Sequence, residues 1–317
     1  MIILYLLIFV LLCYTLVRSG SELVKLLAQL SHYFRLTEFV LAFILMTFAT
    51  TLPELIVGIM SGIKGNSIVS LGNVIGSNFI NLTFILGLVA IVSKGLRVES
   101  RIAKKDTWII FFIALVPLVM LFDKEISSGE GFLLLIIFGW YIWYILKQKD
   151  AFKHRVNHVL KITTTQYKLL RTIFYFILSV AILVLSAWGV VESAKLIAQE
   201  LYIPLALISI ILVAIGTSLP ELVFGIKAAI TKHEGMSLGN LIGSVVINST
   251  FILGITAIIS PIRLENLNVI LIGAGFMLLG IILANVFLSS GRKISIKEGW
   301  ILVGLYILFL IAEFIFR

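Results

Sequence analysis

Long apolar stretches separated by short polar segments recur along the whole chain. Examples are residues 36–62, 107–122, 131–146, 204–226 and 267–288. Each is about as long as the ~20 residues that an α-helix needs to cross the hydrocarbon core of a bilayer. The alternation of apolar and polar positions that is typical of outer-membrane barrels is missing. The pattern predicts an all-α polytopic membrane protein.

The apolar stretches divide into ten predicted transmembrane helices. Residues 2–17 lack the basic segment and the small-residue cleavage site of a signal peptide, so they are interpreted as the first span. The predicted spans are 2–17, 37–62, 70–93, 107–122, 130–146, 169–194, 204–229, 237–260, 267–289 and 298–316.

Composition and charge agree with this interpretation. Hydrophobic residues make up 60% of the 317 positions and charged residues 13%, whereas soluble domains contain about 25% charged residues. If the 147–168 connection is cytoplasmic, 20 of the 25 Lys and Arg residues fall on that side of the membrane. The exceptions are Lys64, Lys124, Lys195, Arg263 and Arg317.

This positive-inside bias places the chain in the cytoplasmic membrane with both termini extracellular. It also accounts for the net charge of +9 without nucleic acid as a partner, with anionic lipid as the minor alternative. Cys13 is the single cysteine, which excludes a disulfide framework and a thiolate metal cage. All four histidines fall near predicted loops, which argues against a transition-metal site.

The chain contains an internal duplication. Shifted by 167 positions, TTLPEL at 50–55 falls on TSLPEL at 217–222. The same shift places SLGNVIGSNFINLTFILGLVAIVS (70–93) on SLGNLIGSVVINSTFILGITAIIS (237–260), and most positions are identical. We therefore predict two homologous halves, 1–147 and 169–317, joined by a basic cytoplasmic linker, 148–168.

Each half contains five predicted spans. Because five is odd, the second half must enter the membrane inverted relative to the first. Inverted repeats are typical of secondary transporters, whose substrate sites lie near the bilayer midplane where the repeats meet.

The repeated LPEL motif places a proline and a glutamate in the middle of a span. A charged side chain at the bilayer centre costs at least about 3 kcal/mol, so Glu54 and Glu221 need a partner or water. Pro53 and Pro220 each remove one backbone hydrogen bond and bend the helix, which frees carbonyl oxygens. Such opened backbone is tolerated in a membrane only where it is buried or lines a watery cavity.

The following span in each half presents a polar face. Asn73, Ser77 and Asn81 are spaced four residues apart and therefore line one side of a helix, and Asn240, Ser244 and Asn248 repeat that face. Glycines at 72, 76, 239 and 243 allow close helix approach.

Together these groups supply two carboxylates, amide oxygens, hydroxyls and carbonyls, without sulfur or imidazole. That is a site for hard cations: Ca²⁺ accepts six to eight such oxygens, whereas Mg²⁺ demands a tighter octahedron. Two glutamates balance one Ca²⁺ or two monovalent ions such as Na⁺. Competition for the same carboxylates would produce exchange.

At these residues the chain resembles the cation/calcium exchanger superfamily, specifically the prokaryotic sodium/calcium exchangers. The signature motifs of that family resemble AIGTSLPEL, TFATTLPEL and GNVIGSN in this sequence. The resemblance implies ten transmembrane helices in two inverted five-helix repeats, with the first and sixth helices sliding across the site. The implied ion-binding residues are Glu54, Glu221, Thr50, Thr51, Asn81, Thr217, Ser218, Asn248, Ser77, Ser244, Thr47 and Ala214.

One position departs from the family pattern, because Asn248 stands where many members have an aspartate. The site would then contain one fewer acidic group. The proton-coupled branch typically has an acidic residue near its Gly-Asn motif, and neither GNVIGSN nor GNLIGSV contains one. This favours Na⁺ over H⁺ as the driving ion.

The predicted function is a Na⁺/Ca²⁺ antiporter of the cytoplasmic membrane, not an enzyme, without a cofactor and functional as a monomer. The alternative is the same fold with different coupling, either H⁺/Ca²⁺ or Li⁺ or another divalent ion. A channel fits a two-fold inverted duplication poorly. An intramembrane hydrolase would need a nucleophile and base or a metal triad, and no His or Cys lies near either motif.

Overall fold

The computed structural model describes residues 2–33, 46–97, 103–147, 166–230, 234–264, 268–290 and 293–315, and these are mostly helical. Up to Lys147 the elements are α1 (Ile2–Tyr33), α2 (Met46–Thr50), α3 (Leu52–Ile63), α4 (Ile68–Ile80), the π-helical η2 (Asn81–Ile85), α5 (Leu86–Val92), β1 (Leu96–Arg97), α6 (Ala103–Met120), the 3₁₀-helical η3 (Leu121–Asp123), β2 (Glu125–Ile126) and α7 (Ser128–Lys147).

From Gln166 onward a similar series follows. It consists of α8 (Gln166–Leu201), α9 (Leu205–Ile208), the π-helical η5 (Ser209–Val213), α10 (Ala214–Thr217), α11 (Leu219–Ile230), α12 (Glu234–Val246), the π-helical η6 (Ile247–Ile252), α13 (Leu253–Ile259), β3 (Ile262–Arg263), α14 (Asn268–Ser290), β4 (Lys293–Ile294) and α15 (Ile296–Ile315). Most of the predicted linker, up to residue 165, lies outside the described residues.

The predicted spans fall on these helices. Within the described ranges, six helices are long and apolar enough to cross a membrane, and a seventh span arises if the bent pair 205–217 and 219–230 counts as one. The predicted spans 37–62, 107–122 and 298–316 fall on α2 with α3, on α6 and on α15, and residues 37–45 lie outside the description. The prediction of a polytopic helical membrane protein is confirmed, and the number ten stays a prediction.

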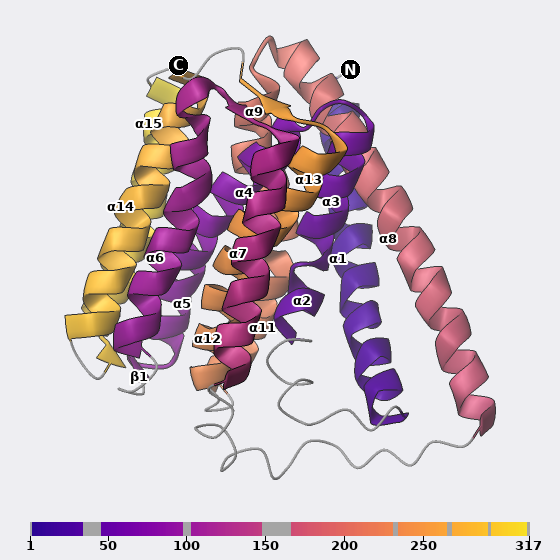
Figure 1. The fold of residues 1–317 in the computed structure, drawn as a ribbon, viewed down its shortest axis with the longest axis horizontal. Coiled ribbons are helices and arrows are strands. Elements are labelled where there is room, and N and C mark those ends of the chain that lie inside the picture. The colour runs from indigo at the N-terminus through magenta and orange to yellow at the C-terminus, as the bar shows by residue number, and fades with distance from the viewer. Residues whose placement is uncertain are drawn as a thin grey trace.

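The helices form one bundle with a distinct pair along its side. Figure 1 shows α1 and α8 next to each other at one side, while α6, α14 and α15 line the opposite side, and α1 and α8 pack against each other. Both chain ends lie at the same end of the bundle (Figure 1). The end of α7 and the start of α8 lie at the opposite end.

Burial distinguishes central helices from peripheral ones. Of the most apolar window in Ile68–Val92, 83% of the residues are buried, and the corresponding share in Glu234–Ile259 is 72%. The windows in Ile2–Glu22 and Ser128–Ile145 are only 22% and 17% buried. Because large apolar side chains such as Leu7 and Trp143 are exposed on the peripheral helices, the outer surface suits lipid, and α4 and α12 are shielded from it.

Contacts between the first and second parts of the chain occur in matched pairs. β1 pairs antiparallel with β4, and β2 pairs antiparallel with β3. Helix α7 packs on α13, and α15 packs on α5. The internal duplication relates the β1–β4 pair to the β2–β3 pair and the α7–α13 contact to the α15–α5 contact.

The starts of α7 and α15 are also built alike. Ser127 and Glu130 form a capping box, in which the Ser127 backbone N–H donates to Glu130 Oε2 (2.8 Å). Ser295 and Glu298 repeat it, with a distance of 2.6 Å. These boxes fix where both helices begin and hence how they meet α13 and α5.

Candidate functional site

Both LPEL motifs interrupt their helices where the sequence predicts. Helix α2 ends at Thr50 and α3 begins at Leu52, while α10 ends at Thr217 and α11 begins at Leu219. The second interruption bends the chain by 42°. Proline is tolerated directly after such a break, because the first turn of a helix has no hydrogen-bond acceptor for its N–H groups. The predicted helix breaks are thus confirmed.

Glu54 and Glu221 each lie in the first turn after a break and are fully buried. Their carboxylates are close enough to interact electrostatically. None of the four carboxylate oxygens has a hydrogen-bond partner. Because the effective penalty for burying an ion in a protein is several kcal/mol, this pair creates a strong demand for positive charge.

Hydroxyl groups surround the two carboxylates. Thr217 and Ser218 interact with Glu54, and Thr50 and Ser244 interact with Glu221. None of these interactions has the geometry of a hydrogen bond, since all four carboxylate oxygens lack a hydrogen-bond partner. The hydroxyls of Ser218 and Ser244 likewise have no partner. The arrangement therefore presents unpaired oxygens from both parts of the chain to a common centre.

Two matched hydrogen bonds connect the LPEL motifs to the asparagine-lined helices. Thr50 donates to Asn240 Oδ1 at 3.0 Å, and Thr217 donates to Asn73 Oδ1 at 2.9 Å. Both members of the second bond stand 167 positions from those of the first. Each bond joins the first part of the chain to the second and is buried, so the two motifs are held in one site.

The helices that follow contain π-helical turns at the predicted amide ligands. Asn81 begins η2, and Asn248 lies in η6. Neither side-chain atom of Asn81 has a partner, and neither does Asn248 Oδ1. Insertions of π-helical turns occur frequently at functional sites, because the extra residue changes which side chains face a neighbour.

Glycine allows the site helices to approach closely at two matched positions. A Cβ atom at Gly76 would overlap the carbonyl oxygen of Ile210 and lie 2.6 Å from Ala214 Cβ. A Cβ at Gly243 would lie 2.7 Å from Thr47 Cγ2. At Gly76 the obstacle is backbone, so only glycine permits this packing, whereas at Gly243 the obstacle is the end of the Thr47 side chain.

The two predicted carbonyl ligands already accept hydrogen bonds. The carbonyl of Thr47 accepts from Thr51 Oγ1 at 2.9 Å and from Thr50 Oγ1 at 3.2 Å. The carbonyl of Ala214 accepts from the Ser218 N–H at 3.0 Å. The Ala214 carbonyl also accepts from Thr217 Oγ1 at 3.4 Å. Both lone pairs of each carbonyl are therefore engaged, and a cation would have to replace one of these hydrogen bonds. Thr51 directs its hydroxyl back along its own helix.

All twelve predicted site residues are buried, and they lie on or between short elements around the two helix breaks. Thr47, Thr50, Thr51 and Glu54 follow one another through α2 and α3; Ala214, Thr217, Ser218 and Glu221 do so through α10 and α11; Ser77 and Asn81 lie on α4 and η2; and Ser244 and Asn248 lie on α12 and η6. Their role as ion ligands stays a prediction.

The structure adds residues that the sequence analysis did not select. Asn78 donates to Ser249 Oγ at 2.8 Å and accepts from Asn248 Nδ2 at 3.1 Å. Asn73 and Asn240 had been placed on the polar faces but not among the ligands. The sequence signal that could have identified Asn78 is its position as the second asparagine of GNVIGSN, where the matching GNLIGSV has a valine.

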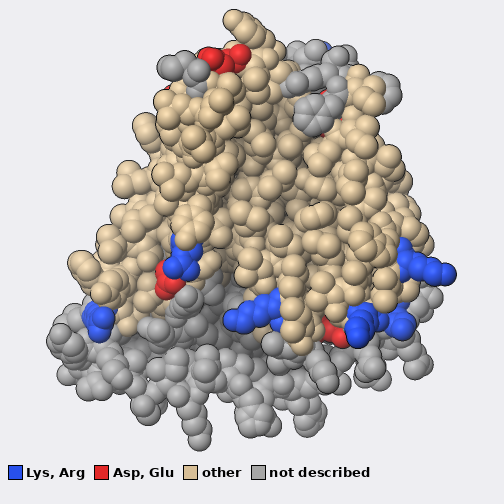
Figure 2. Space-filling view, turned by 180° about the vertical axis from the view of Figure 1, so that it is seen from behind, with Lys and Arg blue, Asp and Glu red and all other residues tan. Residues whose placement is uncertain are grey.

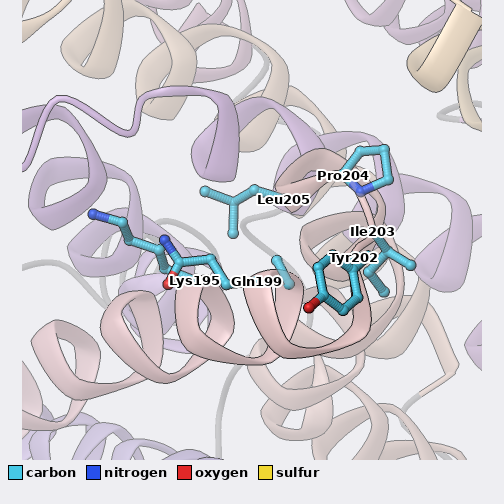
Figure 3. A pocket seen from close by; sticks show the side chains of 7 residues that line it. Lys195, Gln199, Tyr202, Ile203, Pro204 and Leu205 are labelled. Atoms are coloured by element: carbon cyan, nitrogen blue, oxygen red, sulfur yellow. The ribbon is translucent and has the colours of Figure 1, made fainter.

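A separate hollow lies at the end of α8 (Figure 3). It is lined by Lys195, Ala198, Gln199, Tyr202, Ile203, Pro204 and Leu205, none of which is among the predicted ligands. Within the described residues no three His, Cys, Asp or Glu side chains gather as a metal cluster. The candidate site is therefore the polar centre with its two carboxylates.

Comparison with protein families gives a match over almost the whole chain. Residues 4–147 and 171–315 match the family described as "Sodium/calcium exchanger protein". The chain belongs to this family. The predicted resemblance is thereby confirmed, and both LPEL motifs and both asparagine-lined helices lie inside the matched ranges.

Curated members of similar sequence include two from distant organisms. The chain is 29% identical to the sodium/calcium exchanger MaX1 of Methanosarcina acetivorans, over 94% of this chain and 95% of that protein. It is 26% identical to the inner membrane protein YrbG of Escherichia coli, over 79% and 78%. The similarity therefore extends beyond the motifs to nearly the full length of the first relative.

Solved structures of the sodium-calcium exchanger NCX_Mj have the same fold. The form soaked with 10 mM Na⁺ and 10 mM Sr²⁺ has a TM-score of 0.65 and 27% identity, and covers 98% of this chain and 99% of that chain. The form soaked with 100 mM Na⁺ and 10 mM Sr²⁺ has a TM-score of 0.66 and 26% identity. The exchanger fold thus accounts for the whole described chain.

Proposed function

We propose that this chain is an antiporter that exchanges Na⁺ for Ca²⁺ across the cytoplasmic membrane. The observation that carries the proposal is the pair Glu54 and Glu221, which are fully buried within electrostatic range of each other and have four unpartnered carboxylate oxygens. Such oxygens are the ligands that hard cations prefer. The family of the chain and the printed names of its relatives support Na⁺ and Ca²⁺ as the substrates.

Charge balance explains why the same site would exchange rather than leak. Two carboxylates are neutralised by one Ca²⁺ or by two Na⁺. With neither ion bound, both charges would remain buried without compensation, at a cost of several kcal/mol for each. Either substrate therefore allows the loaded site to change the side that it faces, and the empty site resists that change.

We propose that the twelve residues named above supply the ligands. The hydroxyls of Ser218 and Ser244 support this, because they are buried, unpartnered and interact with the glutamates. The amide of Asn81 is also buried and unpartnered. The carbonyls of Thr47 and Ala214 would become ligands by exchanging one of the hydrogen bonds that they accept for the cation. The resulting set is neutral apart from the two glutamates.

We also propose two inverted five-helix repeats, residues 1–147 and 169–317, that alternate around this site. The matched pairs β1–β4 and β2–β3, together with the exchanged packing of α7 and α15, support two-fold pseudo-symmetry. In this proposal α1 and α8, which pack against each other at one side of the bundle, slide to open the site alternately to either face (Figure 1).

The orientation in the membrane follows from the basic residues. Figure 2 shows most of the visible Lys and Arg side chains gathered toward one end, the end where α7 finishes and α8 starts in Figure 1. The positive-inside rule places that end in the cytoplasm and both termini outside. The whole site lies within one chain, which supports a functional monomer.

Sodium-gradient-driven uptake of radioactive Ca²⁺ into proteoliposomes tests the function. We expect uptake when Na⁺ is loaded inside and diluted outside, and its collapse when the gradient is dissipated. Empty liposomes and a Glu54→Gln protein are the controls. Uptake by the intact protein that is no greater than in empty liposomes would reject the assignment of ions.

One observation favours a second candidate, exchange with a different driving ion. Asn248 supplies an amide where many family members have an acid, so the centre contains only two carboxylates. Coupling to H⁺, or transport of Li⁺ or another divalent ion, would suit the same fold. Replacing the Na⁺ gradient by a pH gradient in the same liposomes separates the two candidates.

A further inference from the structure

The amide of Asn248 is held by a series of hydrogen bonds to Asn78 and Ser249, neither of which is a predicted ligand. Its Nδ2 donates to Asn78 Oδ1 at 3.1 Å, and Asn78 Nδ2 donates in turn to Ser249 Oγ at 2.8 Å. All three residues are fully buried. Because the amide group is planar, engaging Nδ2 with Asn78 turns the oxygen of Asn248 to the opposite side, where it has no partner.

The matched residue of the other half is not held in this way. Asn81 stands 167 positions before Asn248, and neither atom of its amide has a partner. The positions that match Asn78 and Ser249 are Val245 and Leu82, which cannot form hydrogen bonds through their side chains. The hydrogen-bonded chain is therefore a feature of one half of the site alone.

The spacing of Asn248 from Ser244 places both residues on the helical face that approaches Glu221. Asn248 follows Ser244 by one helical turn, and Ser244 interacts with Glu221. Before an ion binds, an amide that is free to turn can direct its N–H₂ group into the site, and turning it to present the oxygen then costs part of the binding free energy. Fixing the amide removes the wrong orientation before the ion arrives, as outer partners of metal ligands do.

We propose that Asn78 and Ser249 are positioning residues that lock the Asn248 carbonyl oxygen toward the transported cation. The site then has one fixed neutral oxygen from the second half and one adaptable amide, Asn81, from the first. This inference rests on the proposed function in requiring that a cation binds beside Glu54 and Glu221. It assigns to Asn78 and Ser249 a role in ion affinity without ion contact.

The duplication provides natural variants for the test. Asn78→Val installs the residue of the matched position 245 and removes both hydrogen bonds. Ser249→Ala removes only the hydrogen bond from Asn78 to Ser249, and Ser249→Thr keeps the hydroxyl that accepts it. The control is Thr256→Val, which installs the residue of its matched position, Val89.

Thr256 suits this purpose because it makes a different buried link between the two halves. Its hydroxyl lies 2.9 Å from that of Ser70. Ser237, which matches Ser70, has no hydrogen-bond partner for its hydroxyl, so this link is also confined to one side of the molecule. Thr256→Val therefore removes a comparable bond without touching the amide of Asn248.

Cation binding to the purified full-length protein is measured by titration calorimetry and thermal shift, with Ca²⁺, Na⁺, Sr²⁺ and Li⁺ as separate probes. For whichever cations bind, we expect Asn78→Val to raise the dissociation constant roughly tenfold, the lower end of the effect of outer partners of metal ligands. Ser249→Ala should raise it less, and Ser249→Thr and Thr256→Val should leave it unchanged. In transport, KM should change and maximal rate should not.

The outcomes separate the two proposals. If the intact protein binds none of these cations, the proposed function fails and this inference fails with it. If the intact protein binds and Asn78→Val binds equally well, the inference is overturned while the function stands. If Asn78→Val does not fold, equal affinities of Ser249→Ala and Ser249→Thr would overturn it. Equal losses of affinity in Thr256→Val and Asn78→Val would also overturn it, since the effect would then be structural.

Discussion

Thr50 and Thr217 make the same hydrogen bond to the asparagine of the opposite half, at 3.0 and 2.9 Å, whereas Asn81 and Asn248 are treated differently. The amide of Asn81 has no partner, and that of Asn248 is tied to Asn78. One pair of hydrogen bonds between the halves is therefore symmetric, while the bond from Asn248 to Asn78, which also joins the halves, has no counterpart. The bonds of Thr50 and Thr217 hold the two LPEL motifs to the opposite half, whereas the bond of Asn248 fixes the amide of a single predicted ligand.

The largest expected effect comes from the two carboxylates, which should be equivalent. Glu54→Gln and Glu221→Gln each leave a divalent ion half-neutralised in a buried site, so Na⁺-driven Ca²⁺ uptake should fall at least about 100-fold in both. Glu125→Gln is the control. Glu125 forms an ion pair with the exposed Arg263, and neither residue lies near an LPEL motif in the sequence. Near-normal uptake by either site variant would contradict the predicted site.

The glycine contacts should differ between halves. Gly76→Ala forces a methyl group into the backbone carbonyl of Ile210, whereas Gly243→Ala meets the end of the Thr47 side chain, which can turn aside. We expect Gly76→Ala to destabilise by about 3 kcal/mol and Gly243→Ala by about 1 kcal/mol. Thermal unfolding in detergent measures both, and equal losses would show that the backbones move apart.

Substitutions of Thr50 and Thr217 should have similar effects on stability in the two halves. Thr50→Val removes the bond to Asn240, and Thr217→Val removes the matched bond to Asn73 together with a longer one to Ser77 at 3.4 Å. Each variant should cost about 1 kcal/mol of stability, since the longer bond adds little. Chemical denaturation of the two variants measures the difference. A loss confined to one of them would mean that the two bonds do not support the site equally.

The smallest effect is expected at the divergent ligand. Asn248→Asp adds a third acidic group that can bind a proton, so transport should become several-fold more sensitive to pH than in the intact protein. The matched Asn81→Asp serves as comparison, since its amide is not tied to Asn78. Uptake profiles between mildly acidic and mildly alkaline pH measure the effect, and an unchanged profile for Asn248→Asp would count against Asn248 as a ligand.

Much of the architecture could be predicted because its signals are local. The apolar stretches coincide with helices, and Pro53 and Pro220 mark the interruptions, since a missing N–H acts at its own position in the chain. The burial of Glu54 and Glu221 followed from their place within spans. The predicted ligands could be chosen from these local features and from the duplication, and all of them are buried.

What could not be predicted depends on contacts between distant residues. The bond from Asn78 to Ser249 joins positions 171 residues apart, and the repeat alignment sets them against Val245 and Leu82, so symmetry gave no reason to pair them. The hydrogen bonds already made by the Thr47 and Ala214 carbonyls depend on how sharply each helix breaks. Neither detail has a periodic signature in the sequence.

The exchange of helices between the halves has a consequence for assembly. Because α7 covers α13 and α15 covers α5, each half lacks the outer wall that would seal its own interior. A polypeptide ending near residue 147 could complete its core only by borrowing that wall from another molecule. An ancestral single-repeat chain with this packing would have been an obligate pair, and gene fusion would have made the partner permanent.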